Sequence, residues 1–246
     1  FLSVFGLCSI SGKESVASGK SYLMKELLSR CAGRFVPRTE QDFVGRNILR
    51  SVAGDRSGAN LVAQQVTRAV RLANANDRAP LKFLFNGAPG LGKSSMVQYL
   101  QHLLQCQEWG TTHLNGTQCR IETLESLAAS LHYRNFGDWR LVWIDEVDAL
   151  LDMKVAQTRF LTFMDTLPNG VAVAVTSNCA LSEFDPRFQT RFQVFEFAPP
   201  PADEIAGLLG RIAPQIQTHA LAIAQGACGN VRAALLDAQG VLQQMA

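Results

Sequence analysis

The stretch "GAPGLGKSS", residues 87–95, has the residue types and spacing of a loop that binds phosphate groups. Gly87 is followed by four residues and then by Gly92, Lys93 and Ser94, which is the pattern G-x-x-x-x-G-K-S/T. Backbone N–H groups of such a loop surround a β-phosphate, the lysine reaches the β- and γ-phosphate oxygens, and the serine ligates Mg²⁺. The stretch holds five more residues that we expect to contact the nucleotide: Ala88, Pro89, Gly90, Leu91 and Ser95.

Two acidic residues follow the apolar run in "LVWIDEVDAL". After a phosphate-binding loop, an aspartate at this place holds Mg²⁺ through water, and the next glutamate can polarise an attacking water. An Asp-Glu pair after a strand can also begin a helix. Because the phosphate loop is present in the same chain, we favour Asp145 as a metal ligand and Glu146 as the catalytic base. Asp148 fits the first turn of a helix.

A third apolar run, "AVAVTSN", ends in the polar residues Thr176, Ser177 and Asn178. An uncharged side chain at a strand end can hold the attacking water or the γ-phosphate. Serine and asparagine also favour ordinary turns. Beside the two motifs above, we favour Asn178 as a catalytic residue that senses the γ-phosphate.

The elements that carry these residues alternate between strands and helices. Apolar runs without alternation are typical of strands buried on both faces of a parallel sheet. The sequence predicts a three-layer α/β domain, with a parallel sheet of the P-loop type covered by helices on both faces. Strands are expected over 81–86, 111–114, 141–145, 171–176 and 192–197, and helices over 94–106, 121–131 and 155–167.

The strand pattern stops at three consecutive prolines, residues 199–201. Apolar residues at helical spacing follow over 205–213, 219–227 and 231–245, which predicts a small all-helical lid. We therefore expect an N-terminal extension of unknown role over 1–36, an ATPase core over 37–200 and a helical lid over 201–246.

The composition is that of an ordinary globular protein of 246 residues, 47% of them hydrophobic, with a net charge of +2. No long basic run is present, so composition gives only weak support for nucleic-acid binding. The longest apolar stretches fall short of the roughly 18–20 residues that span a bilayer, so we expect no membrane contact and a cytoplasmic location. The six cysteines show no Cys-x-x-Cys spacing and do not indicate a metal site.

The order of these motifs resembles the AAA+ ATPases, most closely the clamp-loader group typified by replication factor C small subunits. The resemblance covers about residues 37–245 and rests on the motifs above together with "VPRTEQDFVGR", "THLNG", "SNCALSEFDPRFQTRFQVFEFAPPPADEI" and "GNVRAALLDAQ". Clamp loaders continue after the lid into a collar domain, whereas 14 residues follow Arg232 in this sequence (246 − 232). The sequence therefore resembles that group without its collar.

The resemblance assigns further residues to the site. Val44 and Gly45 would lie near the adenine, and Asn115 would couple the catalytic glutamate to ligand. Arg191 stands in the place of the arginine finger, which acts in trans on the nucleotide of a neighbouring subunit, and Arg232 in that of the lid arginine that contacts the γ-phosphate. Arg187 is either a second interface contact or a loop charge.

The same resemblance implies ATP and Mg²⁺ as cofactors and a homo- or hetero-oligomeric ring of five to seven subunits. It also implies DNA and a DNA-associated protein as partners, for loading or remodelling in replication, recombination or transposition. Such a protein would be nucleoid-associated in a bacterium or phage and nuclear in a eukaryote. The alternative is a nucleotide-controlled interaction module whose ATP-bound form recruits a partner with little need for turnover.

Overall fold

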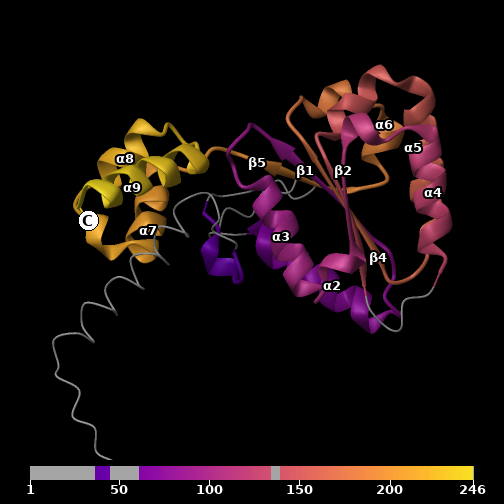
Figure 1. The fold of residues 1–246 in the computed structure, drawn as a ribbon, viewed down its shortest axis with the longest axis horizontal. Coiled ribbons are helices and arrows are strands. Elements are labelled where there is room, and N and C mark those ends of the chain that lie inside the picture. The colour runs from indigo at the N-terminus through magenta and orange to yellow at the C-terminus, as the bar shows by residue number, and fades with distance from the viewer. Residues whose placement is uncertain (1–36, 45–60, 134–138, 246) are drawn as a thin grey trace, which may run out of the picture.

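The computed structural model describes residues 37–44, 61–133 and 139–245, which form a three-layer α/β core and a helical domain beside it (Figure 1). The N-terminal extension expected over 1–36 and the expected base contact Gly45 lie outside the described residues.

The helices and strands follow the order expected from the sequence. The strands of the described residues are β1 (Leu81–Gly87), β2 (Thr111–Asn115), β3 (Arg140–Asp145), β4 (Val171–Ser177) and β5 (Gln193–Phe197). The α-helices are α2 (Leu61–Ala75), α3 (Lys93–Leu103), α4 (Ile121–Leu131), α5 (Lys154–Asp165), α6 (Pro186–Gln189), α7 (Ala202–Ile212), α8 (Ala220–Gly226) and α9 (Val231–Met245). The 3₁₀ helices are η2 (Glu40–Asp42), η3 (Glu108–Gly110), η4 (Gly116–Gln118), η5 (Val147–Asp152), η6 (Leu181–Glu183) and η7 (Pro214–Ile216).

The sheet is parallel throughout, with the strand order β2-β3-β4-β1-β5. The chain leaves β1 and returns at the far edge with β2, so the order reverses beside β1. Ligands of open α/β sheets bind outside the carboxyl ends of the strands at such a reversal. The phosphate loop follows β1, Asp145 ends β3, and Asn178 follows β4, so all three motifs meet at this edge.

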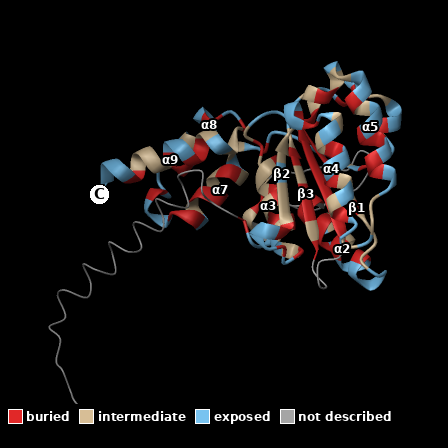
Figure 2. Cartoon of the chain, turned by 45° about the vertical axis from the view of Figure 1, so that its right-hand side comes forward, coloured by how far each residue is buried: buried red, intermediate tan, exposed pale blue. Residues whose placement is uncertain are grey.

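Strand β4 shows why the apolar runs do not alternate. Val171, Val173 and Val175 join the core cluster under α4 and α5, while Ala172 and Ala174 join the cluster under α2 and α3. Both faces are buried, as Figure 2 shows in red through the centre of the sheet. The prediction of a parallel sheet covered on both faces is confirmed.

An aromatic cluster fixes the segment around α6. Phe188 stacks on Phe184 with ring centroids 4.9 Å apart and on Phe160 at 5.6 Å. Phe192 lies 5.1 Å from Phe188 and also stacks on Phe160. Arg191 therefore projects from a segment that is held by buried rings on both sides in the sequence.

The helical domain comprises α7, α8 and α9, which enclose an apolar core of their own. Val44, far away in the sequence, packs against that core. The prediction of a three-layer core followed by an all-helical lid is confirmed, whereas the exact domain boundaries remain a prediction. Within the described ranges, every helix is too short or too polar to cross a membrane.

Candidate nucleotide site

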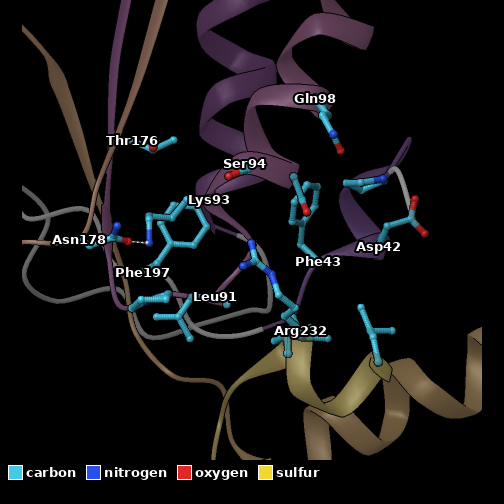
Figure 3. A pocket seen from close by; sticks show the side chains of 18 of the residues that line it. Asp42, Phe43, Leu91, Lys93, Ser94, Gln98, Thr176, Asn178, Phe197 and Arg232 are labelled. Carbon is cyan, nitrogen blue, oxygen red and sulfur yellow. Dashed lines mark hydrogen bonds between the residues drawn. The ribbon is translucent and has the colours of Figure 1, made fainter. Parts of the chain in front are cut away.

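A cavity of about 440 Å³ lies between the carboxyl edge of the sheet and the lid (Figure 3). It has a polar end at the phosphate loop and an apolar end where residues 37–44 meet the lid. Its lining is Pro37, Asp42, Phe43, Val44, Pro89, Gly90, Leu91, Gly92, Lys93, Ser94, Ser95, Gln98, Asp145, Glu146, Thr176, Asn178, Phe197, Leu208, Val231, Arg232 and Leu235. The sequence motifs thus meet at one cavity.

Lys93 is the centre of the polar end and is only 7% exposed. Its Nζ donates to the carbonyl oxygens of Gly87 at 2.6 Å and Ala88 at 2.8 Å, and to Asn178 Oδ1 at 2.8 Å. Figure 3 shows the lysine turned toward Asn178. Three donors and three acceptors match the ammonium form. The lysine and the asparagine expected to contact the γ-phosphate are therefore bonded to each other.

The charges around Lys93 act in both directions. Burial lowers the pKa of Lys93 from its ordinary value, and the positive charge of Arg232 lowers it further. The carboxylates of Asp145 and Asp148 raise the same pKa. The sequence placed Asp148 in the first turn of a helix, and it lies in the 3₁₀ helix η5. Its charge reaches the site although it does not line the cavity.

The two acidic residues at the end of β3 are both held by β4. The Thr176 hydroxyl donates to Asp145 Oδ1 and accepts the backbone N–H of Glu146 at 3.1 Å. Glu146 has φ 54° and ψ 51°, in the left-handed region. A non-glycine residue there costs about 1–2 kcal/mol, and such residues cluster at functional sites.

Asn115 reaches the same glutamate from β2. Its Nδ2 donates to Glu146 Oε2 at 3.0 Å, which is the pairing that the family resemblance led us to expect. Gly116 permits it, because a Cβ at that position would lie 2.1 Å from the carbonyl oxygen of Glu146. The chain just after β2 can approach the backbone of Glu146 this closely only because residue 116 is glycine.

Ser94 and Asp145, the expected Mg²⁺ ligands, line one cavity. Their hydroxyl and carboxylate oxygens fit Mg²⁺, which takes one or two protein oxygens and completes its shell with water and phosphate. Among the described residues, no group of three or more His, Cys, Asp or Glu side chains could hold a metal without such additional ligands. The oxygens of Ser94 and Asp145 fit a cation that arrives bound to a nucleotide.

The apolar end contains residues that the sequence analysis missed. Phe43 is 8% exposed and packs edge-on against Tyr99 of α3, with ring centroids 5.3 Å apart. Val44 lies next to it, against the lid, where the resemblance placed a base contact. Phe43 could have been expected near the base because it precedes Val44 in "DFVG". Its packing on Tyr99 could not, because the two residues are 56 positions apart in the sequence (99 − 43).

The lid touches the phosphate loop through the start of α9. The backbone N–H of Arg232 donates to the carbonyl of Gly90 at 3.2 Å, and Asn230 accepts the N–H of Ala233 at 3.1 Å. Gly90 has φ +83°, a conformation that other residues rarely adopt, and a Cβ there would also lie 2.1 Å from Asn230 Oδ1, so glycine is strongly favoured at this position. The Arg232 side chain extends from the lid toward Ser94 in Figure 3.

Arg191 is the one predicted catalytic residue that does not line the cavity. Its Nε and Nη2 donate to the two carboxylate oxygens of Asp165, at 2.9 and 2.7 Å, and Nη1 donates to the Arg187 carbonyl at 2.7 Å. The guanidinium lowers the pKa of Asp165 and has its own pKa raised. Arg187 forms a similar pair with Asp185.

Comparison with known proteins agrees with this geometry. Residues 83–200 match the family described as "ATPase family associated with various cellular activities (AAA)". Residues 83–200 form an AAA family domain. No curated protein matches the chain. Among solved structures, the Thermotoga maritima RuvB Holliday junction branch migration motor is similar, with a TM-score of 0.62 and 17% identity over 85% of this chain and 72% of that one. A single-substitution variant of that protein gives a TM-score of 0.61 at 17% identity, over the same shares of both chains.

The AAA domain and the helices after it thus have the AAA+ fold. At this level of identity the similarity concerns the fold alone, and it does not distinguish the clamp-loader group from others. Lys93, Asp145, Glu146 and Asn178 belong to the AAA domain, whereas Val44 and Arg232 line the cavity from outside the matched residues.

Proposed function

We propose that this protein is a Mg²⁺-dependent ATPase that works as an oligomer, with ATP bound in the cavity between core and lid. One observation carries the proposal: the phosphate loop, the Asp145–Glu146 pair and Asn178 line a single cavity that also has an apolar end. The triphosphate would lie on the loop, and the base would lie between residues 37–44 and the lid.

Binding would depend on the loop amides, Lys93 and Arg232. The N-terminus of α3, an 11-residue helix, offers N–H groups and a partial positive charge to phosphate oxygens. Lys93 would exchange its three oxygen acceptors for phosphate oxygens. Mg²⁺, held by Ser94 and through water by Asp145, would neutralise charge on the β- and γ-phosphates.

Hydrolysis would depend on Glu146 as the base that polarises the attacking water. Asn178 is placed beside Lys93, from where its amide can orient that water or contact the γ-phosphate. Asn115 holds the Glu146 carboxylate, so a turnover step requires that the carboxylate be shared with, or released to, the water.

A further cation would stabilise the charge that develops on the γ-phosphate, and the family resemblance offers Arg191 for this role. It lies outside its own chain's cavity and on a segment fixed by aromatic packing. We therefore propose that Arg191 completes the site of a neighbouring subunit in trans, in a ring of five to seven subunits. Arginine fingers of this kind contribute on the order of 10³ or more in rate.

The wider role that we favour is the loading or remodelling of a protein on DNA. Support comes from the resemblance to clamp loaders and from the similarity in fold to RuvB, a branch migration motor. The second candidate is a nucleotide-controlled interaction module with slow turnover. It is favoured by the bond from Asn115 Nδ2 to Glu146 Oε2, which engages one oxygen of the carboxylate expected to act as the base.

ATP binding and hydrolysis by purified variants test the ATPase. Lys93→Ala should abolish detectable binding of an ATP analogue, because it removes the buried ammonium that we expect to bind the β- and γ-phosphate oxygens. Glu146→Gln should bind ATP normally and lose hydrolysis by about 10²-fold or more. Lys154→Ala changes an exposed lysine outside the cavity and should match the wild type. Normal hydrolysis by Glu146→Gln would refute the assignment.

Two further measurements separate the two wider roles. A remodelling ATPase on DNA should hydrolyse ATP faster with single-stranded, double-stranded or branched DNA. If every DNA form leaves the rate unchanged, while Glu146→Gln fully complements a deletion strain, the interaction module is the better description.

A further inference from the structure

The hydroxyl of Thr176 is buried at the end of an apolar strand. Residues 171–175 of β4 are all Val or Ala, and Thr176 is 2% exposed. Valine has nearly the same shape and would continue the run. A buried hydroxyl costs free energy unless it finds hydrogen-bond partners, so the partners of Thr176 indicate its role.

Both partners belong to the Asp145–Glu146 pair. Strands β3 and β4 are parallel neighbours with Ile144 opposite Val175, so the next step of the register brings Asp145 beside Thr176. There the hydroxyl donates to Asp145 Oδ1 and accepts the N–H of Glu146 at 3.1 Å. One oxygen atom thus ties the expected metal ligand to the peptide group of the expected base.

The bond to Asp145 determines which carboxylate oxygen remains for ligands. Asp145 lines the cavity. Because Oδ1 is engaged by Thr176, Oδ2 is the oxygen left for a water of the Mg²⁺ shell. Loss of the hydroxyl would free the carboxylate to rotate.

The bond to Glu146 stabilises an uncommon backbone conformation. With φ at 54°, Glu146 departs from the extended backbone of β3, and its N–H needs an acceptor outside the regular ladder. Thr176 supplies that acceptor, while Asn115 holds the carboxylate at the other end of the residue. Glu146 is therefore fixed at both its backbone and its side chain.

We propose that Thr176 is a positioning residue for ATP hydrolysis, which orients the Asp145 carboxylate toward Mg²⁺ and holds Glu146 in place for the attacking water. The proposal rests on the ATPase function proposed above. It assigns Thr176 a role distinct from that of Asn178, since Asn178 bonds to Lys93 and Thr176 bonds to the acidic pair.

The test uses two substitutions that differ in one group. Thr176→Val keeps the shape and removes the hydroxyl, whereas Thr176→Ser keeps the hydroxyl and removes the methyl. Thr162→Val removes an exposed hydroxyl that bonds only within α5 and serves as a matched control. Steady-state hydrolysis is measured as a function of ATP and of Mg²⁺, with circular dichroism melting curves for each variant.

We expect Thr176→Val to lower kcat at least tenfold with KM for ATP within about threefold of wild type, since the interaction acts through catalytic groups. The Mg²⁺ concentration for half-maximal turnover should rise about threefold or more. Thr176→Ser and Thr162→Val should both stay within about threefold of wild type in kcat. If Thr176→Val does not fold, Thr176→Ala removes the same hydroxyl in a smaller side chain, with the same expectations.

Two results would overturn the proposal: a folded Thr176→Val protein with wild-type kcat and Mg²⁺ dependence, or equal losses in the Val and Ser variants. A separate readout does not need turnover. In the Glu146→Gln background, binding of a fluorescent ATP analogue is titrated with Mg²⁺, and Thr176→Val should shift that titration but leave Mg²⁺-free binding unchanged. A wild-type chain that binds ATP without hydrolysing it would refute the proposed ATPase, whereas an unshifted titration would refute the role of Thr176.

Discussion

Arg232 and Arg191 are the two arginines that the family resemblance assigns to the nucleotide, and they differ in their position relative to the cavity and in their contacts. Arg232 lies in the first turn of α9, lines the cavity and is close enough to Lys93 to lower the pKa of that lysine. Arg191 lies outside the cavity and pairs with Asp165 through both carboxylate oxygens. One arginine belongs to the site within its own chain, and the other does not.

The difference also appears in how each arginine is supported. Arg232 belongs to the lid, and its backbone N–H donates to the carbonyl oxygen of Gly90 in the phosphate loop at 3.2 Å. Arg191 lies in the sequence between Phe188 and Phe192, whose buried rings pack on each other and fix this segment to the core. Its three bonds leave two of the five guanidinium N–H donors for another partner. A fixed backbone segment suits a side chain that must contact a second molecule in a defined orientation.

The largest expected effect is on the rate of ATP turnover, and it concerns Arg191. Arg191→Ala should lower turnover about 10³-fold and leave the ATP Kd within about twofold, because in the proposed trans role Arg191 would contact only the transition state in the neighbouring subunit. Arg159→Ala, which removes an exposed ion-paired arginine of α5, should match wild type. Mixing Arg191→Ala with Glu146→Gln should restore activity above that of either protein alone. Full activity in a monodisperse Arg191→Ala monomer would contradict the assignment.

The second effect concerns affinity. Arg232→Ala should raise the ATP Kd about tenfold, because a charge-assisted contact to phosphate is lost within the same chain. Calorimetric titration with a slowly hydrolysed ATP analogue measures it. Arg211→Ala, on α7 and outside the cavity, is the lid control. An unchanged Kd would mean that Arg232 does not contact nucleotide.

The smallest effect tests whether Asp165 prepares Arg191 for its partner. Asp165→Asn should lower turnover about two- to fivefold, as expected for an exposed ion pair. Arg191 lowers the pKa of Asp165, so the pair is intact above the ordinary value of 3.8 and is lost as pH falls through the lowered pKa. The ratio of wild-type to variant rates should therefore stay flat from pH 6 to 8. A faster variant would show that Asp165 restrains Arg191 instead.

The sequence predicted the sheet well because its signals are local. The apolar runs at β3 and β4 begin and end within one residue of the strands, and α4 and α9 have the predicted bounds. The phosphate loop was recognisable from its spacing, and the acidic pair was assigned because it follows an apolar run in a chain that carries that loop. The structure places both at one cavity, because the carboxyl ends of its parallel strands lie at the same edge of the sheet.

The remaining features depend on residues that are distant in sequence. In the sequence, Thr176 is one of three polar residues at the end of an apolar run. Its bonds to Asp145 and Glu146 depend on the register of β3 and β4, which the sequence does not give. Asp165 ends a helix 26 positions before its partner Arg191, with no pattern that links them. Such pairings are set by packing rather than by local propensity.

The three acceptors of Lys93 have a consequence for the kinetics of nucleotide binding. Since the ammonium already bonds to the carbonyls of Gly87 and Ala88 and to Asn178, ATP must displace oxygens that are in place. Binding is then an exchange in which the number of hydrogen bonds changes little. The binding enthalpy of ATP should therefore be small for so highly charged a ligand. The observed rate of binding should level off at high ATP concentration, where rearrangement of the loop becomes rate-limiting.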